Sequence, residues 1–133
     1  MKKLGLFIAL LFTSNLFSQT LLLEENFDFA GNLTDNGWTS HSGGSTNPIS
    51  TTTGLLYVDY PSSNIGNAAL IIATGQSVHR TFTVQTSGSI YTSFLVNVSA
   101  TGTEYFINLG NDPIGTTYRG RIYILNDGWV ILK

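Results

Sequence analysis

The sequence predicts an all-β protein built as an antiparallel β-sandwich. Its composition favours strands, because Thr, Ser, Gly, Asn, Tyr, Ile and Val are common after the first residues, whereas Glu, Lys and Ala are scarce. No long stretch repeats apolar residues at the helical period, and apolar and polar residues instead alternate over short runs. Clusters of Gly, Asn, Asp, Ser and Pro separate these runs, a spacing typical of antiparallel sandwiches and barrels.

Residues 1–19 have the three parts of a secretory signal peptide. Two lysines form the charged head, an apolar stretch runs from Leu4 to Phe17, and Ser18 is a small residue near the cut. A membrane anchor is the alternative, but a span takes roughly 20 apolar residues and Asn15 interrupts this run. We therefore expect cleavage near Ser18 or Gln19, a secreted or cell-surface product and no stable membrane span afterwards.

Residues 20–133 are expected to form a single domain. Of the 133 residues 19 belong to the leader, which leaves 114, enough for one hydrophobic core. Four basic residues then face eight acidic ones, a charge of about −4 that excludes the basic stripe needed for nucleic acid and disfavours anionic membranes. The chain has no cysteine, so disulfides and thiolate chemistry are excluded.

The clearest strand pattern lies between Ser89 and Ser99, where Phe94, Val96 and Val98 share one face and polar residues fall mainly on the other. Shorter runs of the same kind predict further strands. These are Leu21 to Phe27, Leu55 to Tyr60, Ala68 to Ala73, Val78 to Val84, Glu104 to Leu109, Arg119 to Leu125 and Trp129 to Leu132. On the Val78 to Val84 run, Arg80 is expected near the strand end, with its guanidinium reaching solvent or a carboxylate.

The last two runs are expected to pair as a hairpin. Asp127-Gly128 lies between them and supplies the positive backbone dihedrals of a tight turn, so Ile122 to Leu125 should face Trp129 to Leu132. Trp129, on a strand, is expected to be buried. The sequence ends at Lys133 directly after four apolar residues, and we expect a longer sandwich whose further strands would cover this edge.

The region from Ala30 to Thr53 is rich in turn-forming residues and is expected to be a long loop. Trp38 and His41 are its most visible candidates for a surface site.

Several short motifs together resemble the N-terminal part of a concanavalin A-like, or laminin-G-like, jelly-roll domain of secreted bacterial proteins. The motifs are Glu25-Asn26-Phe27-Asp28, Asn36-Gly37-Trp38 with His41-Ser42-Gly43, Gly66-Asn67-Ala68, Val78-His79-Arg80-Thr81-Phe82, Tyr91 to Val98 and Arg119-Gly120-Arg121. The resemblance covers nearly all of the mature chain. It implies a jelly-roll sandwich, incomplete at its C-terminus, and often export by the type IX route. Its members include lectins, glycanases and spacer domains, so it assigns no activity.

The chain lacks the motifs of an enzyme, and we expect it to be noncatalytic. A retaining glycanase needs two carboxyl groups about 5 Å apart. Glu24 and Glu25 are adjacent and would point to opposite faces of a strand, and Glu104 stands alone. A serine hydrolase elbow and a phosphate-binding glycine loop are also missing.

Zinc needs three or four clustered ligands, and His41 and His79, far apart in the sequence, do not supply them. No cofactor is therefore expected, with calcium as the open alternative. Its hard oxygen ligands are present at Asn111, Asp112 and Asp127, although the same residue types also serve turns.

Carbohydrate binding is the function that best matches the residue types. Sugar rings stack on aromatic side chains while a few polar groups fix their hydroxyls. The candidate ligand-binding residues are Trp38, His41, Tyr57, Tyr60 and Tyr118. The expected partner is a polysaccharide or cell-surface glycan. A structural spacer of a larger secreted protein and, less favoured, the remnant of a glycan-degrading enzyme are the alternatives.

Overall fold

The computed structural model describes residues 19–72 and 74–132. The signal-peptide prediction therefore lies outside the described residues except for Gln19. Within the described part, helix is limited to one 3₁₀ turn, η1 (Leu33–Asp35), and every strand pair is antiparallel. The expected all-β class is thus confirmed. No helix in these ranges has the length and apolarity to cross a bilayer.

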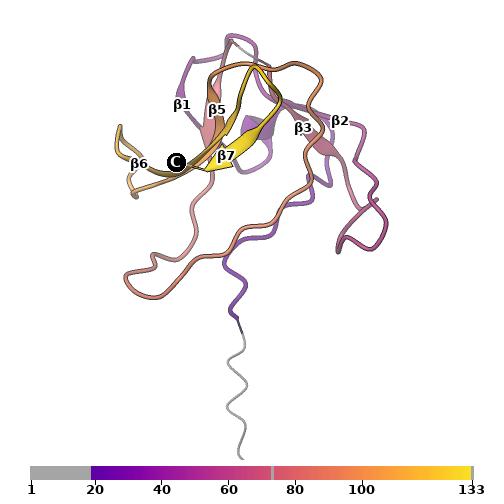
Figure 1. The fold of residues 1–133 in the computed structure, drawn as a ribbon. Coiled ribbons are helices and arrows are strands. Elements are labelled where there is room, and N and C mark those ends of the chain that lie inside the picture. The colour runs from indigo at the N-terminus through magenta and orange to yellow at the C-terminus, as the bar shows by residue number, and fades with distance from the viewer. Residues whose placement is uncertain (1–18, 73, 133) are drawn as a thin grey trace, which may run out of the picture.

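Between residues 19 and 132, as far as the structure describes them, seven strands form three small sheets. β1 (Thr39–Ser42) pairs with β4 (Ser77–His79), and β2 (Ser50–Thr52) pairs with β3 (Ala68–Leu70). The third sheet contains β5 (Tyr105–Gly110), β6 (Tyr118–Ile124) and β7 (Val130–Leu132), in that order. The sheets are not closed, and Figure 1 shows them gathered at one end of the molecule.

The C-terminal hairpin forms as the sequence predicts. Ile122 faces Leu132 and Ile124 faces Val130 across β6 and β7. Gly128 adopts a φ of 85°, which a side chain would strain, and its N–H donates to the Leu125 carbonyl at 2.8 Å. The Asp127 side chain accepts from the Trp129 N–H at 3.2 Å and completes the turn. Local turn chemistry was sufficient to predict this element.

The Ala30 to Thr53 region is more ordered than its turn-rich composition predicts. It contains η1, β1 and β2, so the expectation of one long loop was wrong. Long-range hydrogen bonds account for the order. The Leu33 N–H donates to the Ile49 carbonyl at 3.0 Å, and the Thr51 N–H donates to Gly31 at 2.9 Å. These partners are distant in sequence, and no local pattern announces them.

Three of the expected strands are absent from the sheets. Leu21 to Phe27, Leu55 to Tyr60 and Ser89 to Ser99 contain no assigned strand, and the run Val78 to Val84 is a strand only at its start. Figure 1 shows the chain between β4 and β5 as a long excursion without arrows. Alternation places side chains on two faces, but a strand also needs a hydrogen-bonded neighbour. These segments lack a regular ladder, so the prediction of strands there was wrong.

The buried core of the described residues is small. Leu33 is 2% exposed, and Ile49, at 9%, is the other buried apolar side chain in these ranges. Trp129 is 69% exposed, so its expected burial was wrong. It lies at the hairpin turn, just before β7. Burial therefore reflects what packs on a face and cannot be inferred from a strand pattern alone.

Candidate functional site

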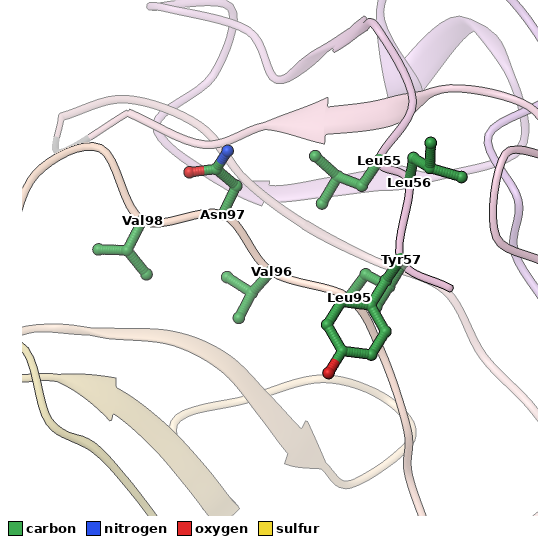
Figure 2. A pocket seen from close by; sticks show the side chains of 7 residues that line it. All are labelled: Leu55, Leu56, Tyr57, Leu95, Val96, Asn97 and Val98. Atoms are coloured by element: carbon green, nitrogen blue, oxygen red, sulfur yellow. The ribbon is translucent and has the colours of Figure 1, made fainter. Parts of the chain in front are cut away.

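A groove of about 290 Å³ lies between the segment 55–57 and the segment 95–98. Figure 2 shows its lining side chains, which are Leu55, Leu56, Tyr57, Leu95, Val96, Asn97 and Val98. Most of the lining is aliphatic, while one phenol ring and one amide provide the polar groups. A concave, mainly apolar surface with few polar groups is the usual form of a small-ligand site.

The Tyr57 wall of the groove is shaped by turns. The Tyr57 N–H donates to the Ser63 hydroxyl at 2.7 Å, and the Asn64 N–H donates to the Leu55 carbonyl at 3.2 Å. Asp59 and Asn64 have φ of 64° and 61°, a conformation that Asp and Asn tolerate better than most residues. The turn residues fix the backbone and leave the Tyr57 side chain 67% exposed.

The opposite wall keeps the side-chain alternation that the sequence predicts. In Figure 2, Val96 and Val98 point to one side of the chain, and Asn97 points to the other. The Asn97 amide has both donor and acceptor atoms, which suit hydroxyl groups. The groove therefore combines an exposed aromatic ring with an amide that can fix the orientation of a polar ligand.

Tyr60 links the two walls. Its hydroxyl donates to the Ser93 hydroxyl at 3.1 Å, which joins the turn after Tyr57 to the segment before Leu95. Tyr60 thus has a positioning contact near the groove, and it is not among the lining residues. The structure brings Tyr57 and Tyr60 to the same turn, where the Tyr60 N–H donates to the Tyr57 carbonyl at 3.3 Å.

Trp38 lies beside a second cavity of about 220 Å³. Its lining residues are Leu23, Glu25, Phe27, Trp38, Thr92, Ser93, Phe94 and Ile107. The Trp38 ring stacks on Phe27 with centroids 6.0 Å apart, and its indole N–H donates to Glu25 Oε2 at 3.0 Å. Trp38 is therefore a half-buried member of a cluster, and its indole donor is already used.

Glu25 is the centre of that cluster. Its carboxylate pairs with the Arg80 guanidinium and accepts from the Phe27 N–H at 2.8 Å, in addition to the Trp38 bond. The expectation that Arg80 reaches solvent or a carboxylate from the end of its strand is confirmed. Three donors satisfy the carboxylate, so it is poorly suited to act as an acid or to bind a ligand. Sequence reasoning missed the cluster because its members lie on three distant segments.

Tyr118 belongs to an aromatic cluster on the third sheet. Its ring lies 5.7 Å from that of Tyr105, which is 5.8 Å from Tyr123, and the Arg121 guanidinium carbon lies 5.6 Å above the Tyr105 ring. Burial, followed by contact with Tyr118, raises the pKa of the Tyr105 phenol above its ordinary value. Tyr118 is therefore a half-buried member of this cluster, in contact with Tyr105 and near the Arg121 guanidinium.

His41 lies on β1 next to His79 on β4. Their ring centroids are 5.5 Å apart, and the rings meet at 62°. The sequence interpretation treated these residues as isolated, and this was wrong, because strand pairing brings them together. Burial and, second, the neighbouring His79 lower the pKa of His41 below its ordinary value.

The predicted calcium ligands lie at two ends of one strand. Asn111 and Asp112 precede β6, whereas Asp127 follows it, so about 20 Å of strand separates them. Within residues 19–72 and 74–132, no group of three His, Cys, Asp or Glu side chains could share a metal ion. Any calcium site would use one end alone, with amide and backbone oxygens, and it stays a prediction.

Comparisons with protein-family models, with curated proteins and with solved structures find no match for this chain.

Proposed function

We propose that this chain is a secreted, noncatalytic binding module whose groove at Tyr57 takes a carbohydrate. The observation that carries the proposal is the exposed Tyr57 ring on the wall of a groove that also contains the Asn97 amide. A sugar ring has apolar C–H faces that stack on a phenol ring and hydroxyls that an amide can bind. The groove volume, about 290 Å³, suits a ligand of one or two rings.

The Trp38 cavity supports the proposal less well than the Tyr57 groove. One face of the Trp38 ring stacks on Phe27, and Glu25 already accepts hydrogen bonds from three protein groups. A sugar entering there would have to displace these contacts. At the Tyr57 groove, by contrast, the phenol ring is already open to solvent, so a ligand gains contacts without breaking protein ones.

The finer parts of the proposal rest on sequence patterns. Export follows from the charged and apolar leader, and the two-layer jelly-roll architecture follows from the family resemblance. The small antiparallel sheets agree with an all-β sandwich at the coarse level. A structural spacer is the competing function, and it differs from a binding module in predicting no ligand.

Binding to a panel of soluble polysaccharides, followed by isothermal titration with oligosaccharides of the best one, tests the proposal. We expect weak, saturable binding, and the Tyr57→Ala change should reduce the affinity about tenfold, a loss of about 1.4 kcal/mol. The Asn97→Leu change, similar in volume but unable to hydrogen bond, should also weaken binding. Tyr91→Ala is the matched control, since Tyr91 is 77% exposed but lines neither cavity.

Two results would contradict the proposal. Failure of the unmodified chain to bind any polysaccharide would favour the spacer. Release of reducing sugar that is lost on changing Glu25 or Glu104 would instead favour a glycan-degrading enzyme.

A further inference from the structure

The β1–β4 strand pair brings together the two histidines of the chain. Thr39 faces His79 and Ser40 faces Val78, but the next pair is Ser42 with Ser77, which leaves His41 as the additional residue of a bulge. A bulge redirects the side chains beside it. Here the redirected side chain is an imidazole, and its ring lies 5.5 Å from the ring of His79.

This separation matches the geometry of an ion held between two imidazoles. At a Zn–N distance of about 2.0–2.1 Å, two rings facing one tetrahedral ion have centroids about 5 Å apart. The observed distance between the ring centroids is 5.5 Å. A small rotation of the side chains would close the difference from that value. Both histidines lie on paired strands, so the β1–β4 register holds the two rings near each other.

The imidazole nitrogens also have unused bonding capacity. The Nδ1 atoms of both His41 and His79 are buried without a hydrogen-bond partner, and the Oε1 atom of Gln76, which precedes β4, is in the same condition. Buried polar atoms without partners are uncommon, and a bound ion is one way to satisfy them. No described hydrogen bond engages either ring, so both are available to reorient and bind.

The charged side chain next to the two rings in the sequence already has a partner. The cation next to His79 in the sequence, Arg80, is neutralised by its pair with Glu25. A divalent cation between the rings would therefore not be repelled by an unpaired positive charge at Arg80.

We propose that His41 and His79 form a two-histidine site for a divalent transition metal ion, Zn²⁺ or Cu²⁺. Imidazole nitrogens suit these ions, whereas Ca²⁺ and Mg²⁺ prefer oxygen ligands. No third His, Cys, Asp or Glu joins the pair in the described ranges. The site therefore has fewer protein ligands than the three or four of usual zinc sites, and water would supply the remaining positions. The ion would join β1 to β4, and the site is separate from the Tyr57 groove and independent of carbohydrate binding.

Titration of the full chain with ZnCl₂, followed by calorimetry and by the imidazole proton resonances, tests the site. Because the chain has two histidines, each resonance reports directly on one of them. We expect both to shift together and to saturate at one Zn²⁺ per chain. Cu²⁺ should give an electron paramagnetic resonance spectrum with nitrogen hyperfine coupling, while Ca²⁺ and Mg²⁺ should leave both resonances unchanged.

His41→Gln and His79→Gln should each weaken Zn²⁺ binding at least tenfold, since each leaves a single imidazole. Asp112→Asn is the matched control, because it removes a candidate oxygen ligand elsewhere and should leave Zn²⁺ affinity unchanged. The resonance shifts need no variant, so a variant that fails to fold does not remove the test. Unshifted imidazole resonances at millimolar Zn²⁺, or equal Zn²⁺ affinity in the double variant, would overturn the proposal.

Discussion

Arg80 forms an ion pair with Glu25, which lies 55 residues earlier in the chain. The pair connects the N-terminal segment to the residue that follows β4. The Glu25 side chain is 14% exposed, and it also accepts the Trp38 indole N–H and the Phe27 backbone N–H. One carboxylate thus joins the N-terminal segment to the residue before β1 and the residue after β4, which are paired strands of one sheet.

Replacing the carboxylate should cost more stability than replacing its cation. Glu25→Ala leaves the Trp38 and Phe27 donors without their acceptor and should lower the free energy of unfolding by about 1–3 kcal/mol. Arg80→Ala removes a partly exposed partner and should cost about 1 kcal/mol or less. Urea unfolding followed by tryptophan fluorescence measures both. Glu24→Ala serves as an exposed control, and equal losses at Glu25 and Arg80 would disagree with this order.

The small core predicts an unequal response to two Leu→Ala changes. Leu33 is 2% exposed, and Leu33→Ala should lower the free energy of unfolding by about 2–4 kcal/mol, because the change leaves a cavity. Leu56 is 73% exposed, and the same change should stay within about 0.5 kcal/mol. Thermal denaturation of the two variants provides the comparison. Similar losses would mean that residues 19–72 and 74–132 pack differently from the arrangement described above.

Stability should fall in mild acid because of His41. Its pKa is lowered in the folded state, so the unfolded chain binds the proton more readily. The contribution of His41 to folding stability is fully present above the ordinary pKa of histidine. It is lost as the pH falls through the lowered pKa of His41 in the folded state. The free energy of unfolding, measured between about pH 7.5 and 5, should show this loss. EDTA is present so that no metal ion binds the histidines, and His41→Gln should reduce the loss. An unchanged pH profile in His41→Gln would assign the effect to other groups.

Gly66 should tolerate no side chain. It has a φ of 64°, and a Cβ atom there would clash with the Asn26 carbonyl oxygen, which also accepts the Asn67 N–H. We expect Gly66→Ala to cost about 2 kcal/mol or more, since strain and overlap add. Gly31→Ala separates the two effects, because Gly31 also has a positive φ, of 102°, but no atom lies within 4 Å of the added carbon. Equal melting temperatures for the two variants would argue against the close approach at Gly66.

Two segments in the C-terminal half of the chain differ in how well the sequence predicted their structure. The hairpin of β6 and β7 was predictable, because Asp127-Gly128 fixes its turn and its strands are neighbours in sequence. The Ser89 to Ser99 run has a clearer alternation but no strand. Its side-chain faces were predictable, as Val96 and Asn97 show in Figure 2, whereas its hydrogen-bond partner was not.

The candidate site residues divide in the same way. Tyr57 and Trp38 were identifiable as residue types suited to sugars, but their exposure depends on what packs against them. Trp38 donates to Glu25 and stacks on Phe27, while Tyr57 remains open above its groove. His79 had no local signal at all, since its importance comes from a partner on another strand.

By itself, the sequence determined the all-β class, the C-terminal hairpin and the placing of Arg80 at the end of its strand, because alternation and turn chemistry act between near neighbours. The tertiary structure alone decided which runs pair, which aromatic rings stay exposed, and that His41 meets His79. Those outcomes depend on contacts between segments far apart in the chain, whose free energies no local pattern encodes.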